Sequence, residues 1–115
     1  MKTIGLAILI ALSSSALAGA AGAERTITVS AKNFAFVPST ITLKANQRVK
    51  LHFVSKQGVH GIVIPEIGVT NVVNMGPSPV DVQVTPKKPG TYVARCAVYC
   101  GIGHGKMVLT VKVTK

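Results

Sequence analysis

The sequence predicts an all-β domain, an antiparallel β-sandwich of Greek-key type. Apolar and polar residues alternate with a period of two in several short segments, as in strands that bury one face. Turn-forming Pro, Gly, Asn and Ser separate these segments, and after the N-terminal stretch no helical period of useful length occurs. About seven short strands at this spacing typically pack as two facing sheets. A chain of 115 residues accommodates one such domain.

The alternation is clearest in segments where Val, Ile or Leu takes turns with Thr, Ser, Lys, His, Asp or Gln. Strands are therefore expected at 26–31, 40–44, 49–53, 80–85 and 107–113. The turns that break the pattern are expected at 37–39, 45–47, 76–79 and 86–90. Neither an internal repeat nor a linker interrupts this part of the chain.

Residues 1–23 predict a secretory signal peptide. The charge of Lys2 precedes an apolar run at 4–12, and small residues with two Ala-x-Ala sites follow, the second ending at Ala23. Cleavage there leaves residues 24–115 as the domain. The alternative is an uncleaved membrane anchor, because the same stretch is just long enough to span a bilayer. In both cases the domain is expected in the periplasm or another extracytoplasmic space.

The chain is strongly basic, with 13 Lys and Arg, only three acids and a formal net charge of +10. An exported protein rarely meets nucleic acid, and the basic residues are scattered, with only Lys87 and Lys88 adjacent, so no nucleic-acid partner is expected. An acidic protein or an anionic membrane surface fits the compartment better. Three acids cannot supply a Ser–His–acid or paired-carboxylate set, so neither catalytic residues nor a small-molecule substrate are expected.

Four metal-binding side chains fall within twelve residues: Cys96, Cys100, His104 and Met107. Thiolate and thioether are soft ligands and imidazole is borderline, a set that selects copper over calcium, magnesium or manganese. Zinc prefers a closed set of Cys and His and has little use for Met. Glycines between these residues allow the sharp turns that bring the side chains together.

Other interpretations of this segment are open. Two cysteines in an exported chain usually form a disulfide, but a Cys96–Cys100 bridge would leave the spacing of His104 and Met107 unexplained. A mononuclear blue-copper site would use one Cys with His and Met, and the second Cys would be a spectator. Met107 also has the parity of the buried face of the last strand, so packing is a further alternative for it.

The spacing Cys-x3-Cys-x3-His-x2-Met at 96–107 resembles the dinuclear copper A loop of cytochrome oxidase subunit II and of nitrous oxide reductase. Lys-Pro-Gly-Thr-Tyr at 88–92 resembles the strand that precedes that loop, and Val-His-Gly-Ile at 59–62 is similar to the family's other histidine-bearing loop. The likeness extends over 32–113 and is closest to the small subunit II of ba-type oxidases. It implies a cupredoxin fold.

The resemblance also implies how two copper ions would be held. Both cysteine thiolates would bridge the ions, and each histidine would bind one of them. A methionine sulfur and a backbone carbonyl would be weak axial ligands. The implied ligands are the bridging Cys96 and Cys100, the terminal His60 and His104, and the axial Met107 and Val98 carbonyl.

Two departures from the family pattern concern the surroundings of the metal. Gln57 stands three residues before the first histidine, where the family commonly has an acid. The chain also has no Trp, the residue type often implicated in electron uptake, and Phe34 or Phe36 is expected to substitute.

These residues predict an exported copper protein that transfers single electrons and is not an enzyme by itself. It would act as a free carrier or as a subunit II-like component of a membrane oxidase complex, with an acidic redox protein as partner. The alternatives are a copper storage or delivery protein using the same ligands, and a mononuclear blue-copper carrier. With an oxidised cysteine pair, the sandwich would serve only for binding.

Overall fold

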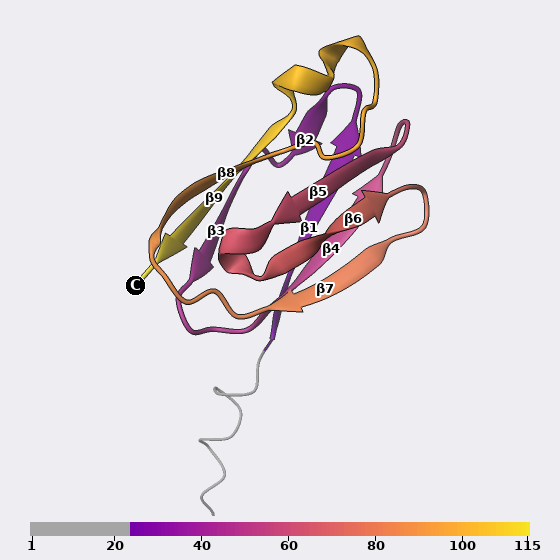
Figure 1. The fold of residues 1–115 in the computed structure, drawn as a ribbon. Helices are drawn as coiled ribbons and strands as arrows, with labels where there is room; N and C mark the ends of the chain where they lie inside the picture. The colour runs from indigo at the N-terminus through magenta and orange to yellow at the C-terminus, as the bar shows by residue number, and fades with distance from the viewer. Residues whose placement is uncertain (1–23) are drawn as a thin grey trace, which may run out of the picture.

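A computed structural model describes residues 24–115, and the predicted signal segment 1–23 lies outside the described residues. The described chain is built almost entirely from strands joined by short turns (Figure 1). The strands are β1 (Arg25–Lys32), β2 (Ala35–Val37), β3 (Thr40–Lys44), β4 (Val49–Ser55), β5 (His60–Ile64), β6 (Val69–Met75), β7 (Val80–Val84), β8 (Gly90–Arg95) and β9 (Val108–Thr114). Two short 3-10 helices complete the described elements, η1 (Pro65–Ile67) and η2 (Ile102–Lys106).

The strands form two layers that face each other across the core. One sheet has the order β2-β1-β4-β7, a second has the order β3-β9-β8, and β5 and β6 form a hairpin of their own. The predicted β-sandwich is confirmed. Two pairings, β1 with β4 and β3 with β9, are parallel, because the chain crosses between the sheets before it returns beside an earlier strand.

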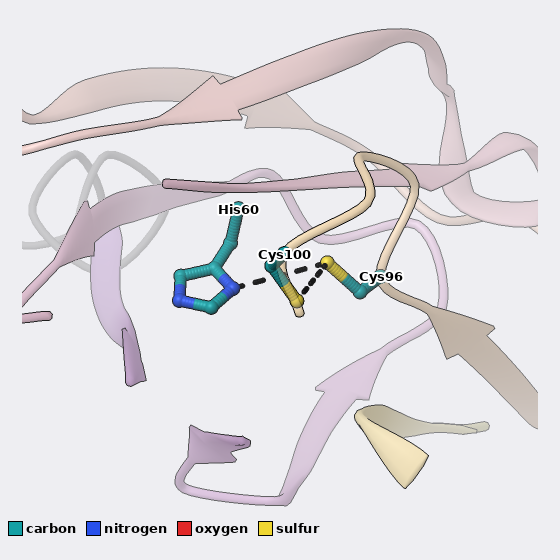
Figure 2. Close-up of side chains that lie close together, drawn as sticks. All are labelled: His60, Cys96 and Cys100. Carbon is teal, nitrogen blue, oxygen red and sulfur yellow. Dashed lines mark hydrogen bonds between the residues drawn. The ribbon is translucent and has the colours of Figure 1, made fainter. Parts of the chain in front are cut away.

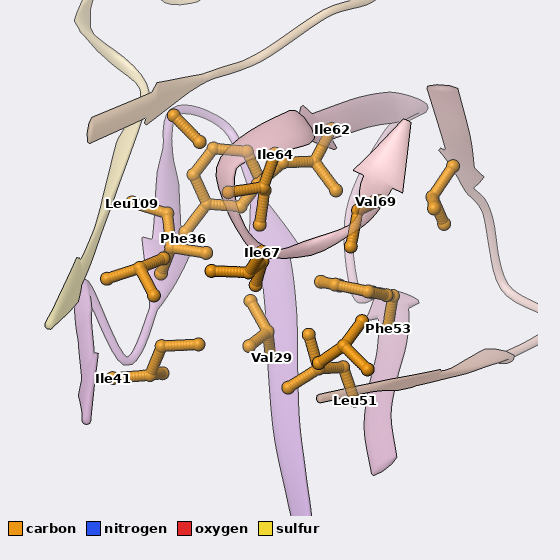
Figure 3. Packing of buried hydrophobic residues seen from close by; sticks show 14 of the residues in the cluster. Val29, Phe36, Ile41, Leu51, Phe53, Ile62, Ile64, Ile67, Val69 and Leu109 are labelled. Atoms are coloured by element: carbon orange, nitrogen blue, oxygen red, sulfur yellow. The ribbon is translucent and has the colours of Figure 1, made fainter. Parts of the chain in front are cut away.

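The core lies between the layers and is made of the inward-facing residue of each pleat. Along β4 every second side chain is buried, which follows from the period of two in its sequence. Phe53 and Leu51 on this strand are completely buried and belong to the same hydrophobic cluster as Phe36 from β2 and Leu109 from β9 (Figure 3). Burial of each such side chain contributes about 1.5–3 kcal/mol, so this core holds the loops at its end in place.

The five strands expected from alternation are present, one with the expected bounds and the others with bounds that differ by one or two residues. The strands that sequence alternation did not identify are β2, β5, β6 and β8. His60 was expected in a loop, but it is the first residue of β5. This strand is buried at nearly every position, so it lacks the polar alternation that marks a strand with one solvated face. Among residues 24–115, no helix is long and apolar enough to cross a membrane.

Candidate metal centre

One end of the sandwich collects the predicted metal-binding side chains. The connection between β8 and β9 carries both cysteines. It contacts the start of β5, which carries His60. A β-bridge joins Ile62 to Cys96, and the Ala97 N–H donates to the Gly61 carbonyl at 2.8 Å. These backbone contacts bring the histidine of one strand beside the thiols of the loop (Figure 2).

The two cysteine sulfurs lie close together and are not bonded. Their Sγ atoms are 3.8 Å apart, far longer than the ~2.05 Å of a disulfide, and both thiols are free. A thiolate binds a metal of this type at about 2.3 Å, so two sulfurs at this separation can both reach the same ion. The ligand atoms of Cys96, Cys100 and His60 all lie within 4.8 Å of one another, so the site fits a shared metal.

His60 is completely buried and its ring orientation is fixed from behind. Its Nε2 lies 2.8 Å from the Gln57 carbonyl, which can only accept, so Nε2 carries the proton and donates. The other ring nitrogen, Nδ1, faces the Cys96 sulfur at 4.0 Å. The buried Ser55 hydroxyl hydrogen-bonds within the same turn, to the Gly58 carbonyl at 2.5 Å, and so holds the turn that orients the ring. The hydrogen bond from His60 Nε2 to the Gln57 carbonyl is of the kind that metal-binding histidines typically make.

The remaining predicted ligands gather around the same sulfur pair. The His104 Nδ1 lies 3.6 Å and the Met107 Sδ 3.5 Å from the Cys100 sulfur. The Val98 carbonyl oxygen lies 3.2 Å from the Cys96 sulfur. One histidine therefore stands beside each cysteine, with a carbonyl on the Cys96 side and a thioether on the Cys100 side.

Loss of solvent contact raises the pKa of the Cys100 thiol. Desolvation raises the pKa of the Cys100 thiol from 9.0 to about 11, with a further contribution from the neighbouring Cys96. The protonated thiol is therefore the dominant form at neutral pH. A metal must displace that proton, so loading is expected to weaken as pH falls.

Met107 is both a core residue and a neighbour of the thiols. Its side chain is completely buried, and its sulfur is the atom that meets Cys100. Met107→Leu keeps volume and apolarity, so the fold should survive at a cost below about 1.5 kcal/mol. Because a weak axial sulfur tunes the potential of a copper site, the reduction potential of the copper-loaded chain should shift, as a redox titration would show.

The control is Leu43→Met, the reverse exchange at a buried position of β3, opposite Val113 at the other end of the sandwich. This control should leave the potential unchanged. Equal potentials for Met107→Leu and the unmodified chain would show that Met107 only packs the core.

The cysteine loop is shaped by an aromatic ring beneath it. A Cβ on Gly103 would come within 2.4 Å of the Phe34 ring, so no larger residue fits there without moving the ring. Gly101 has φ = +129°, a region that side chains other than glycine rarely adopt. On the β5 side, Gly61 leaves room for the Val98 side chain, which a Cβ would approach to 2.5 Å. Small residues thus allow the loop to lie flat on the sandwich.

Of the two phenylalanines expected to take the place of the missing Trp, only Phe34 has an exposed side chain. Phe36 is buried in the core, and Phe34, 39% exposed, packs under the loop. The aromatic side chain that extends from the site to the surface is Tyr99, which sequence reasoning missed. It is 74% exposed, and its ring centre lies 5.4 Å from that of His104. The position of Tyr99 between the two cysteines in the sequence could have indicated that it lies at the metal site.

The third histidine lies outside this cluster. His52 points from β4 to the partly solvated face of the sheet, where its Nδ1 is 2.5 Å from an Asp81 carboxylate oxygen. The two residues are directly opposite each other on β4 and β7. A cross-strand pair with a side chain one-third exposed supports the sheet surface rather than the metal site.

A β-sandwich with Cys, His and Met side chains at one end offers soft ligands suited to copper. The chain belongs to the cupredoxin-like domain family, whose model matches residues 3–109. Its sequence is 32% identical over 75 residues to a probable cytochrome c oxidase subunit 2 of Streptomyces avermitilis, covering 64% of this chain and 23% of the relative. A probable cytochrome c oxidase subunit 2 of Streptomyces coelicolor is 48% identical over 31 residues, 27% of this chain and 10% of the relative. The chain thus matches less than a quarter of the length of these relatives.

Several solved structures share this fold. The periplasmic domain of cytochrome oxidase subunit II from Bradyrhizobium japonicum superposes with a TM-score of 0.70 at 14% identity, covering 78% of this chain and 83% of that domain. A chain of a heme-copper terminal oxidase dimer superposes with a TM-score of 0.64 at 26% identity, covering 77% of this chain and 64% of that chain. The blue copper protein auracyanin A of Chloroflexus aurantiacus superposes with a TM-score of 0.62 at 20% identity, covering 80% of this chain and 100% of that protein.

Proposed function

We propose that this protein is an exported one-electron carrier built around a dinuclear copper A centre. It would act either freely or as the subunit II-like component of a terminal oxidase. The observation that carries the proposal is the pair of free thiols 3.8 Å apart with one histidine beside each. A single mononuclear site of the His2Cys type with an axial Met would use both imidazoles but would leave one thiol of this cluster without a role.

The proposed ligand roles follow from which atoms face the sulfur pair. Cys96 and Cys100 would bridge, His60 and His104 would each bind one ion through Nδ1, and the Met107 sulfur would be a weak axial donor. The Val98 carbonyl would be the second axial donor. Bound there, two coppers would supply a one-electron couple shared over both ions, with little change in bond length on reduction.

The chain's own contribution is to hold these ligands still and keep water away. His60, Cys96 and Met107 are buried, and the Gln57 carbonyl fixes the His60 ring before any metal arrives. Ligands on a rigid framework need not rearrange when the charge of the site changes. The sandwich therefore lowers the barrier to electron exchange by pre-positioning the donors.

The end of the sandwich that carries the site would also be the docking face. Ile102 and Tyr99 in the cysteine loop are 97% and 74% exposed, so the surface over the site has an apolar centre. Lys56, Lys106 and Arg95 are exposed at the same end. Apolar centres with a charged rim are typical of protein interfaces, and the positive rim favours an acidic redox protein as partner.

Metal analysis with optical and paramagnetic spectra of the copper-loaded chain tests the proposal. We expect two coppers per chain and a purple mixed-valence centre whose unpaired electron is shared by both ions. One copper with an intense blue colour would instead indicate a mononuclear carrier. Colourless Cu(I) that transfers readily to an acceptor would indicate storage or delivery, and failure to bind copper would leave a sandwich that only binds partners.

A further inference from the structure

Basic side chains gather at the end of the sandwich opposite the metal centre. The parallel strands β1 and β4 both begin at this end, and the parallel strands β3 and β9 both end there. The turn between β7 and β8 joins them through a 2.7 Å hydrogen bond from the Asn46 N–H to the Pro86 carbonyl. We call this end the basal pole, and its exposed cations are Arg25, Lys44, Arg48, Lys87, Lys88 and Lys115.

The basal pole is distinct from the site by position and by surface chemistry. β4 runs the length of the sandwich from this pole to the turn that orients His60, roughly 20 Å for a strand of its length. Figure 1 shows the 3-10 helix η2 of the cysteine loop at the other end from the start of β1. Cations here therefore cannot serve as the rim of the face above the metal centre.

Little negative charge offsets these cations. Glu24 is the acid at the pole, and it pairs with Arg48 at 3.5 Å. Asp81 lies along the sheet opposite His52. Glu66 lies in η1, which follows the end of β5 farther from the metal centre. The Tyr92 hydroxyl donates to the Lys88 carbonyl at 2.6 Å and holds the turn that presents Lys87 and Lys88.

The pole lacks the apolar side chains that a protein interface uses as its centre. Among the described residues, the large hydrophobic side chains that are exposed lie elsewhere, in the cysteine loop, beside His60, or along the sheets and their other turns. Protein interfaces are typically centred on aromatic and apolar anchors. An anionic lipid surface needs only an array of cations, each worth about 1 kcal/mol when it reaches the headgroups.

The place where the preceding segment joins the domain also favours a membrane surface at the basal pole. Residue 24, where the described structure starts, lies at this pole, since the next residue is the first of β1. The 23 preceding residues, which carry the predicted apolar leader or anchor, are therefore attached at this end. We propose that the basal pole docks on an anionic phospholipid surface and leaves the metal centre facing away from it. The proposal does not depend on copper binding.

Lysine footprinting on vesicles tests this orientation directly. The full chain is mixed with phosphatidylglycerol-containing or purely phosphatidylcholine vesicles, acylated at lysines, and analysed by mass spectrometry. On anionic vesicles Lys87 and Lys88 should be protected, whereas Lys56 and Lys106 at the metal end should react as in solution. Equal reactivity of all four lysines, or protection of the metal-end pair, would overturn the proposal.

Matched double substitutions measure the contribution of the pole. The measured quantity is the affinity for anionic vesicles divided by the affinity for neutral vesicles. Any contribution that residues 1–23 make equally to both affinities drops out of this ratio. Lys87→Gln with Lys88→Gln should lower this ratio roughly twenty-five-fold at low salt, since each cation contributes about fivefold. Lys56→Gln with Lys106→Gln removes the same charge from the metal end and should change the ratio less than about twofold.

Two results would contradict lipid docking. Equal losses for both pairs would mean that only the net charge matters. Indifference of the unmodified chain to anionic vesicles, together with slower electron exchange of the Lys87→Gln, Lys88→Gln chain with an acidic protein, would assign the pole to a protein partner. A chain that fails to bind copper but passes both vesicle tests would leave the docking intact and remove the proposed electron-transfer function.

Discussion

Replacing Cys100 with Ser should abolish the shared-electron spectrum of the copper-loaded chain and lower its copper content below two ions per chain. The Cys100 sulfur contacts the sulfur of Cys96, the Nδ1 of His104 and the sulfur of Met107, so it is the atom on which the proposed ligands converge. A hydroxyl is a hard, protonated ligand at neutral pH and cannot take the place of a bridging thiolate. The side chain is only half-buried, and the change keeps its shape, so the fold should remain.

Cys96→Ser should have the same spectroscopic effect, because bridging requires both sulfurs. The matched control is His52→Gln, which removes an imidazole from β4 and the contact with Asp81 but leaves the cysteine loop untouched. This control should retain two coppers and the same spectrum. One copper per unmodified chain, with Cys100→Ser spectroscopically silent, would eliminate the dinuclear centre and leave Cys96 as the single thiolate of a mononuclear site.

The fold was predictable because most strands bury one face and expose the other. The alternation of Val, Leu and Phe with polar residues in β4 is the direct imprint of that arrangement. Alternation did not predict β5 because this strand is buried on both sides. It did not predict β2 because three residues are too few to show a period. The parallel pairings were also not predictable, since alternation reports which face is buried and says nothing about the neighbouring strand.

The candidate site was predictable in part because four of its side chains belong to one loop. Local spacing is visible in a sequence, whereas His60 comes from a distant strand and was found only through resemblance to a family. Its orientation depends on the carbonyl of Gln57, a backbone atom present at every residue and therefore invisible in the sequence. Tyr99 was missed because exposure and ring contact with His104 are properties of the folded loop.

The partner at the metal end should be recognised by charge. A chain with a formal net charge of +10 and three acids, none of them in the cysteine loop, cannot offer an acidic face to a basic cytochrome. Electron exchange with an acidic carrier should be accelerated by attraction, on the order of 10–10³-fold at low salt. Screening at about 8 Å under physiological ionic strength should erode that advantage, so the rate should fall as salt is added. Exchange with a basic cytochrome should start slowly and quicken.

Stopped-flow rates across a salt series, with matched variants, separate this docking from bulk charge. Lys56→Gln with Lys106→Gln removes two cations from the surface around Ile102 and should slow exchange with the acidic carrier while flattening its salt dependence. Lys87→Gln with Lys88→Gln removes the same charge from the basal pole and should have a much smaller effect on this rate. Rapid exchange with a basic cytochrome that slows as salt is added would mean that attraction acts through an acidic patch, and the docking face would have to be sought near Asp81 or Glu66.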